Sequence, residues 1–320
     1  MEKLESYFKQ LAEHKEPANL YNPIYYTLSQ GGKRIRPRLV FLSTELFGGD
    51  IEKAVYPAAA FEMLHNFTLI HDDIMDRAPL RRGRPTVYKE WNTSTAILAG
   101  DALATMAIKE ILQTPADCRT VIDLSRLLAE TSVEICEGQQ KDLDFETSDR
   151  VTIEDFLKMI RYKTAVMLAG CLKAGAILSH TSEANQLAVY NYGIHIGLAF
   201  QLKDDLLDVY ADHAEFGKAI GGDIQDNKKT YLFLRALHDG SPQQQKELLY
   251  YFSGENFDAQ KKFNAVTAIY EQLQIKSKTE LLIEEFVQKS LSELDKITID
   301  DSQKKDILKQ LAIELSSRKK

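Results

Sequence analysis

The sequence predicts an all-α protein, and two observations lead to that prediction. Apolar residues recur at spacings of three and four along most of the 320 residues, as in EKAVYPAAAFEMLHNFTLI and TIEDFLKMIRYKTAVMLAGCLKAGAIL. The chain has only 8 Pro and 16 Gly, and it contains no alternating apolar and polar run of useful strand length. Helices separated by short loops are therefore expected throughout.

Local signals indicate where individual helices begin and end. A helix is expected to open near Pro37 and to end at Gly48 and Gly49, because Pro suits the first turn and Gly the position after the last. Thr152 followed by Asp155 resembles a capping box, which would start another helix. These signals support the helical class element by element.

No Ser/Gly/Pro-rich tract divides the chain, so we expect one domain over residues 1–320. The stretch from about residue 245 to 320 is amphipathic and charged, and it is predicted to form surface helices over an earlier core. The most loop-like segments are residues 78–86, 212–230 and 238–244.

Composition excludes several classes of function. Lys and Arg number 40 against 47 Asp and Glu, and the resulting net charge of -7 disfavours nucleic acid or an anionic membrane as the main partner. No signal-peptide pattern and no run of eighteen apolar residues is present, so we expect a cytoplasmic protein without stable membrane insertion. The three cysteines lack a C-x-x-C spacing and are predicted to be reduced core thiols: Cys118, Cys136 and Cys171.

Two acidic motifs, DDIMD and DDLLD, each follow a long apolar helical pattern. Their aspartates are Asp72, Asp73, Asp76, Asp204, Asp205 and Asp208. On a helix the first and last aspartate of each motif lie about 40° apart, on one face. Like charges there repel, and they also oppose the helix dipole near the C-terminus, so the arrangement costs stability unless a cation binds. A single such motif is typical of a solvated helix face, but two copies favour Mg²⁺, which bridges carboxylates to substrate phosphates.

Three basic segments, GGKRIRP, RRGRP and FGKAIGGDIQDNKKT, could bind phosphate through flexible backbone and long cations. Each segment on its own is typical of a solvated loop. Together with the acidic motifs they indicate two phosphorylated ligands, one held through metal and one held by cations alone. The cations are Lys33, Arg34, Arg36, Arg81, Arg82, Arg84, Lys218, Lys228 and Lys229.

The chain resembles the trans-isoprenyl diphosphate synthases over nearly its whole length. The motifs that carry this resemblance occur in the family's order: GGKRIRP, LIHDDIMD, RRGRPT, EGQQKDLDFE, YKTA, FQLKDDLLD and GKAIGGDIQDNKKT. The resemblance implies one helical bundle around a central active-site cavity, a homodimer, and about three Mg²⁺ ions per site. It also implies a prenyltransferase that ionises an allylic diphosphate (dimethylallyl, geranyl or farnesyl), condenses it head-to-tail with isopentenyl diphosphate and eliminates a proton.

The resemblance assigns roles to the matching positions. Asp72, Asp76 and Asp204 are implied as the main Mg²⁺ ligands, supported by Asp73, Asp205 and Asp208. The isopentenyl diphosphate pocket is implied at Lys33, Arg36, His65 and Arg82. The allylic diphosphate is implied to meet Arg81, Lys163, Lys218 and Lys228. Thr164 and Gln201 would face the developing carbocation, with Gln139 and Asp142 as a supporting pair. His65, taken alone, would be a core histidine.

One position departs from the family pattern. Asn227 stands in DIQDNKK where the family often has Gly. Asn tolerates the left-handed backbone conformation next best after Gly, so we expect the loop to be kept.

Product length depends on the helix that precedes the first acidic motif. Thr68 lies about 6 Å below Asp72 on the same helical face, with Leu64 and Phe61 deeper. The family resemblance instead points to Phe67, where an aromatic side chain is typical of short-chain synthases, although it lies about 140° from Asp72 around the helix. With more weight on the family comparison, we expect a product of fifteen or twenty carbons.

Three other functions would be consistent with all or part of this motif set. A longer-chain polyprenyl diphosphate synthase would share every motif, whereas a non-catalytic partner subunit of a heteromeric synthase would be expected to lack one acidic motif. A terpene cyclase would share the first acidic motif but would not need GGKRIRP or a second intact DDLLD. The basic C-terminus, Arg318 to Lys320, would either close the active site or remain a frayed end.

Overall fold

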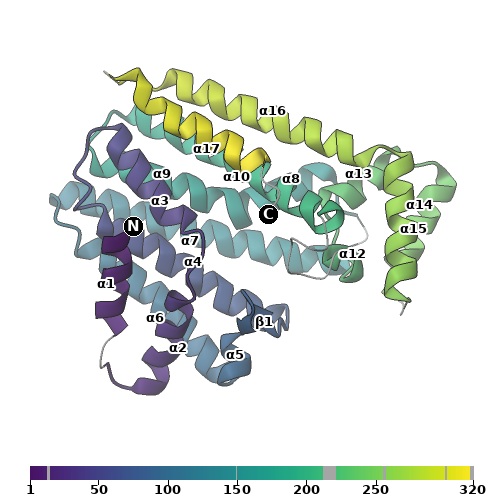
Figure 1. The fold of residues 1–320 in the computed structure, drawn as a ribbon, viewed down its shortest axis with the longest axis horizontal. Helices are drawn as coiled ribbons and strands as arrows, with labels where there is room; N and C mark the ends of the chain where they lie inside the picture. Colours follow the sequence, from purple (N-terminus) through teal and green to yellow (C-terminus); the bar gives the residue numbers. More distant parts are fainter. Residues whose placement is uncertain (13–14, 149, 212–220, 255–256, 300, 318–320) are drawn as a thin grey trace. The chain divides into compact units, whose positions relative to one another are not determined.

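The structure is a computed structural model, and helices make up most of what it describes (Figure 1). It describes residues 1–320 except 13–14, 149, 212–220, 255–256, 300 and 318–320. The strands in the described part are β1 (Leu80–Arg81) and β2 (Arg84–Pro85), which pair antiparallel as a two-residue hairpin. The prediction of an all-α fold is confirmed.

The chain packs into two compact units. Unit 1 comprises Met1–Ser132 and Gly170–Tyr190, and unit 2 comprises Val133–Ala169 and Asn191–Lys320. The expectation of one domain stays a prediction.

Unit 1 is built around α4, which packs along α6. The fully buried residues Ala58 to Phe61 lie on α4, and Leu103 and Ala107 on α6 are equally buried. The small side chains of Ala58 to Ala60 allow close packing in the first half of α4. The first acidic motif lies at the other end of this helix, in its C-terminal turn. The helices of this unit are α1 (Glu2–Ala12), α2 (Ala18–Ser29), α3 (Ile35–Leu46), α4 (Val55–Met75), α5 (Val87–Glu90) and α6 (Thr93–Leu112), with parts of α7 (Cys118–Thr147), α9 (Val166–Leu178) and α10 (Glu183–Tyr210).

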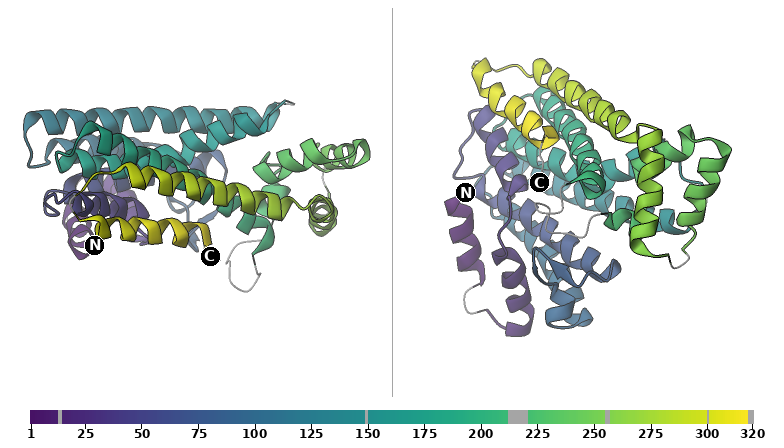
Figure 2. Two further views of the ribbon diagram at one scale, coloured as in Figure 1. Left: turned by 90° about the horizontal axis from the view of Figure 1, so that it is seen from above. Right: turned by 45° about the vertical axis from the view of Figure 1, so that its right-hand side comes forward.

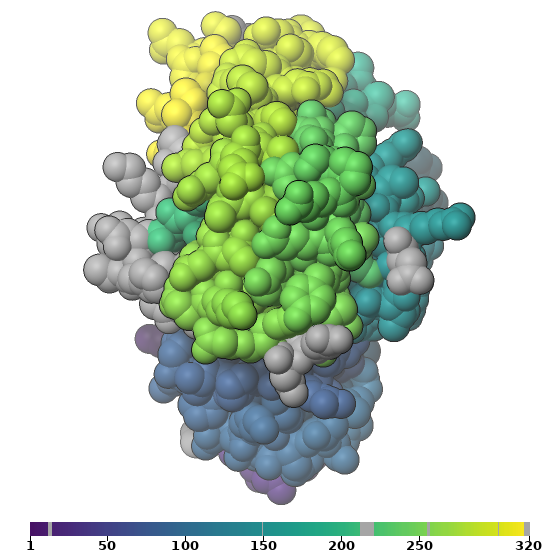
Figure 3. Space-filling model, turned by 90° about the vertical axis from the view of Figure 1, so that its right-hand side faces the viewer, coloured from purple at the N-terminus to yellow at the C-terminus, as the bar shows by residue number. Residues whose placement is uncertain are grey.

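Unit 2 contains the second half of α10, which ends in the other acidic motif. Helices α16 and α17 run antiparallel, side by side (Figures 1 and 2), and α14 packs against α15 at the front of the view in Figure 3. The remaining elements are α8 (Ile153–Ile160), the π-helix η1 (Arg161–Ala165), α12 (Gly222–Gln225), α13 (Tyr231–Asp239), α14 (Pro242–Tyr251), α15 (Ala259–Gln272), α16 (Ile275–Lys296), η2 (Ser302–Lys304) and α17 (Lys305–Ser317).

Several local predictions can be checked directly. The capping box is confirmed, since the backbone N–H of Asp155 donates to Thr152 Oγ1 at 3.1 Å and Asp155 Oδ2 accepts from the Thr152 N–H at 3.1 Å. The helix around Pro37 is also confirmed, as α3. The cysteine prediction is wrong for two of three, because Cys171 is buried whereas Cys118 and Cys136 lie on exposed helix positions.

In the described residues, none of the helices has both the length and the apolar character required to cross a bilayer.

Candidate active site

The first acidic motif lies in the last turn of α4, as predicted. Asp76 caps the helix, and its N–H donates to the Asp72 carbonyl at 2.8 Å. Asp72 is half-buried and Asp76 exposed, whereas Asp73 is only 3 % exposed. The i and i+4 aspartates therefore both remain accessible while the middle one turns inward, as the helical period requires.

Asp73 is paired with Arg81 of β1. Arg81 Nη2 lies 2.6 Å and Nε 2.7 Å from Asp73 Oδ1. Burial raises the pKa of Asp73, and the hydrogen bond from Arg81 opposes that shift. This contact joins the hairpin to the acidic turn at the end of α4.

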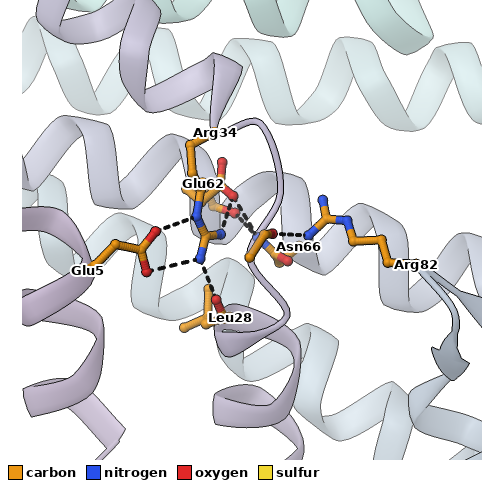
Figure 4. Close-up of polar contacts among 7 residues, drawn as sticks. Glu5, Leu28, Arg34, Glu62, Asn66 and Arg82 are labelled. Atoms are coloured by element: carbon orange, nitrogen blue, oxygen red, sulfur yellow. Dashed lines mark hydrogen bonds and ion pairs between the residues drawn. The ribbon is translucent and has the colours of Figure 1, made fainter. Parts of the chain in front are cut away.

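The GGKRIRP loop and the hairpin meet at Gly31 and Gly32. Arg82 donates from Nη1 to the Gly31 carbonyl (Figure 4). A Cβ built on Gly32 would lie 2.9 Å from the Arg82 guanidinium carbon, and Gly32 also has a φ of +123°. Only glycine meets both demands, which explains the second Gly of the motif physically.

The charges of four arginines act on His65 of α4. Burial and the charges of Arg36, Arg82, Arg81 and Arg34, in that order, hold the pKa of His65 well below its usual value, so the imidazole is neutral at neutral pH. Arg36 Nε is buried and has no hydrogen-bond partner among the described residues. Burial lowers the pKa of Arg36. A cluster of cations with an unsatisfied donor is suited to an anion.

The second acidic motif lies near the C-terminus of α10, and the 221–230 loop folds against it. Asp208 Oδ2 accepts from the backbone N–H of Asp223 at 3.0 Å, and the Asp208 carbonyl accepts from the Gly221 N–H at 2.8 Å. Asp223 was not predicted as a site residue. Its only sequence signal is its place in GGDIQDNKK, between the acidic motif and Lys228.

Asp205 is the buried member of this motif, at 6 % exposure. Its Oδ1 accepts from Gln201 Nε2 at 3.0 Å, whereas Oδ2 has no partner among the described residues. Burial and the nearby charge of Asp223 raise the pKa of Asp205 well above its usual value. An orphaned carboxylate oxygen in an acidic cluster fits a hard divalent cation.

The described residues contain no group of three or more His, Cys, Asp or Glu side chains that alone could hold a metal ion. This is compatible with Mg²⁺, which is commonly bound by one or two carboxylates together with substrate phosphates and water. Asp72 with Asp76, and Asp204 with Asp208, are the side chains that would supply such pairs.

Lys163 and Thr164 lie on η1, a π-helical turn that periodicity did not predict. Lys163 Nζ contacts Asp142 Oδ2 at 2.5 Å, and Thr164 Oγ1 donates to Gln201 Oε1 at 3.0 Å. A Cβ on Gly138 of α7 would lie 2.3 Å from the Lys163 backbone nitrogen, so glycine permits the close approach. π-turns of this kind occur frequently at functional sites.

A chain of hydrogen bonds joins three of the predicted residues, two of them one turn apart on α10 and the third on η1. Thr164 bonds to Gln201, which in turn bonds to Asp205. The supporting pair is only partly as expected, because Asp142 binds Lys163 while Gln139 Oε1 is buried without a partner among the described residues.

Two adjacent lysines have different surroundings. Lys229 Nζ donates to the carbonyls of Phe145 at 2.7 Å and of Ser148, at the C-terminal end of α7. This matches the favourable placement of a cation at the end of a helix. Lys228 is exposed and lies 3.9 Å from Asp223 Oδ1. Two further predictions, Lys218 and the Arg318 to Lys320 tail, fall outside the described residues.

Asn227 adopts the left-handed conformation, with φ of 58°, as predicted from its side chain. Its Oδ1 accepts from Lys262 Nζ at 2.6 Å, and Lys262 is only 3 % exposed. The second acceptor of that ammonium, the Gln225 carbonyl, is 3.4 Å away. The amide of Asn227 therefore does more than tolerate the turn, because it also satisfies a buried cation.

Replacing Asn227 by Gly is expected to lower the free energy of unfolding by about 1–3 kcal/mol, because the buried ammonium of Lys262 loses its main acceptor. The backbone conformation is retained in this variant. The double variant N227G/K262M should lose less stability than the sum of the losses of the two single variants, because only the double variant removes both partners and leaves neither group unpaired. Denaturant unfolding of the three variants measures this. Additive losses would contradict the assigned pairing.

Comparison with known proteins decides the family. Residues 17–270 match the family model described as polyprenyl synthetase. The chain belongs to the polyprenyl synthetase family. It is 40% identical over 232 residues to a geranylgeranyl pyrophosphate synthase of Geoglobus acetivorans, which covers 72% of each chain. It is also 40% identical over 242 residues to a geranylfarnesyl diphosphate synthase of Natronomonas pharaonis, which covers 71% of each.

The fold matches this family as well. A crystal structure of a geranylgeranyl pyrophosphate synthase superimposes with a TM-score of 0.94 at 40% identity, over 99% of this chain and 97% of that one. The family resemblance drawn from the ordered motifs is therefore confirmed.

Proposed function

We propose that this polyprenyl synthetase is a trans-prenyltransferase that condenses an allylic diphosphate with isopentenyl diphosphate, giving a product of fifteen to twenty carbons. The observation that supports it best is the arginine cluster around neutral His65, with the unpartnered Nε of Arg36. Such a cluster suits a diphosphate held without metal, while the acidic turns suit one held through Mg²⁺. An enzyme that joins two diphosphates needs both kinds of site.

The reaction begins with ionisation of the allylic carbon–oxygen bond. Asp72, Asp76 and Asp204 are the aspartates proposed to bind Mg²⁺, which would neutralise the charge of the leaving diphosphate. Arg81, Lys163 and Lys228 are the cations proposed to interact with the allylic diphosphate. The contact with Asp142 restricts the position of the Lys163 ammonium.

The remaining steps are condensation and proton loss. Thr164 and Gln201 orient their oxygen dipoles through their mutual bond at 3.0 Å, and they would stabilise the developing carbocation. Lys33, Arg36, His65 and Arg82 would hold isopentenyl diphosphate so that its double bond attacks the allylic carbon. The departing diphosphate would accept the proton, because no dedicated base was identified among these residues.

Product length is proposed to depend on Phe67 rather than Phe61. Phe67 is half-buried, and its ring lies 4.8 Å from that of His71 in an edge-to-face arrangement. Phe61 is fully buried, and a Cβ on Gly170 would lie 3.0 Å from its ring. Phe61 is therefore packed in the core of unit 1, which leaves Phe67 and the half-buried Thr68 to border a growing chain.

A homodimer is also proposed. Four apolar side chains on one side of α6 are 43 to 62 % exposed, and helical geometry places them within an arc of about 100°. Exposed Asp101 and Thr105 lie within the same arc, so the apolar residues form two groups, one near each end of α6. Exposed apolar groups on one side of a helix favour burial against another molecule. These residues are Ile97, Leu98, Ile108 and Leu112. A cytoplasmic location stays a prediction from the sequence.

The function is tested by measuring pyrophosphate release with each substrate separately and with both. A prenyltransferase releases pyrophosphate only when Mg²⁺, the allylic diphosphate and isopentenyl diphosphate are all present. Release from the allylic diphosphate alone would indicate a cyclase-like reaction. No release from any combination would indicate a non-catalytic partner subunit, and either result would overturn the proposal.

A further inference from the structure

Arg34 lies between Lys33 and Arg36 in the GGKRIRP loop, yet its environment differs from that of Arg36. Its side chain is 5 % exposed, and all three guanidinium nitrogens already have acceptors (Figure 4). Nη1 donates to Glu62 Oε1 at 2.6 Å, Nε donates to Glu5 Oε1 at 2.8 Å, and Nη2 donates to the Leu28 carbonyl. Arg34 is therefore committed to protein contacts and is not available to a diphosphate.

The backbone at Arg34 is strained. Its φ of 45° and ψ of 40° lie in the left-handed region, which costs a non-glycine residue free energy unless its surroundings hold it there. The two carboxylates and the Leu28 carbonyl supply that restraint. Because Arg34 is the N-cap of α3, its conformation sets how the loop enters the helix that carries Arg36.

One of the two carboxylates comes from α4. Glu62 is 2 % exposed and precedes His65 by three residues, about one helical turn. Asn66 Nδ2 donates to the Glu62 carbonyl at 2.7 Å and lies 3.4 Å from Glu62 Oε1. The Arg34–Glu62 pair thus fixes the loop to the helical turn that presents His65.

The other carboxylate comes from α1, which lies before the start of the family match at residue 17. The side chain of Glu5 is 44 % exposed and is therefore not part of the buried core. Phe8, three residues later, is buried and places its ring 5.4 Å below the Arg34 guanidinium carbon. One face of α1 therefore contacts Arg34 through both a charge and an aromatic ring.

We propose that α1 supports the isopentenyl diphosphate site, and that Glu5 acts through Arg34 as a positioning residue. Glu5 keeps Arg34 in its left-handed conformation and so keeps Lys33 and Arg36 directed toward the substrate. This inference rests on the proposed function, and it adds a helix outside the family match to the binding site for one of the two substrates.

The test compares Glu5→Ala with Glu2→Ala, a matched loss of one glutamate from the same helix at an exposed position. Glu5→Ala is expected to raise the KM for isopentenyl diphosphate about fivefold, as a partly exposed charged pair is lost, and to leave the KM for the allylic diphosphate unchanged. Glu2→Ala should leave both unchanged. Glu5→Gln, whose amide oxygen can still accept from Arg34, should recover most of the loss.

Calorimetric titration with isopentenyl diphosphate provides a readout that does not need turnover. Absence of isopentenyl diphosphate binding to the wild-type protein would overturn the proposed function, and this inference with it. If the wild type binds isopentenyl diphosphate and the Glu5→Ala and Glu2→Ala variants bind it with equal dissociation constants, the inference alone would be overturned. A parallel rise in both KM values would also overturn it, because it would show a general loss of structure.

Discussion

Replacing Asp72 by alanine is expected to lower kcat by about a thousandfold or more, because loss of a Mg²⁺ ligand removes several kcal/mol of stabilisation from the leaving diphosphate. Asp72 is accessible at the end of α4, unlike the buried Asp73 that Arg81 already holds. The fold should be unaffected. The free energy of unfolding without Mg²⁺ should even rise by roughly 0.3–1 kcal/mol, because a negative charge leaves a helix C-terminus.

The matched control is Glu45→Ala, which removes one negative charge from an exposed position on α3. Its kcat should equal that of the wild type. Steady-state kinetics over a range of Mg²⁺ concentrations, together with denaturant unfolding, measure both effects. Near-normal turnover of the Asp72→Ala variant in excess Mg²⁺ would refute the metal assignment.

Replacing Arg36 by glutamine is expected to raise the KM for isopentenyl diphosphate by about 10- to 100-fold, because a hydrogen bond between charged groups is lost from a buried site. The unpartnered Nε of Arg36 makes it the arginine of the cluster most ready to bind an anion. The KM for the allylic diphosphate should change little, since that substrate is held through metal.

Arg38 provides the control for this variant. It lies two residues further along α3, is exposed, and points about 160° away from Arg36 around the helix. Arg38→Gln should leave both KM values within about twofold of the wild type. An equal effect of the two substitutions, or an equal rise in both KM values for Arg36→Gln, would contradict a separate metal-free site.

Local sequence rules predicted much of the fold because they depend on neighbours in the chain. The helical period placed Asp72 and Asp76 on one accessible face and turned Asp73 inward, and the Thr152 capping box formed as expected. The left-handed conformation of Asn227 followed from its side chain as well. The cysteine prediction failed at Cys118 and Cys136 because burial depends on which helix face meets a neighbour, and composition does not contain that information.

Tertiary pairing explains most of what the sequence did not predict at the site. Lys33, Arg34 and Arg36 look alike in GGKRIRP, but only contacts from α1 and α4 show that Arg34 is a structural cation. Lys228 and Lys229 are distinguished in the same way, since Lys229 binds carbonyls at the end of α7. The π-turn at Lys163 has no periodic signal, because it depends on the close approach of Gly138.

The most direct test of the central claim is to size the product. The purified protein would be incubated with Mg²⁺, labelled isopentenyl diphosphate and a short allylic diphosphate, and the alcohols released by dephosphorylation would be separated by chain length. The account predicts labelled alcohols of fifteen or twenty carbons. Products of thirty carbons or more would contradict the short-chain assignment, and the absence of any labelled alcohol would contradict the prenyltransferase itself.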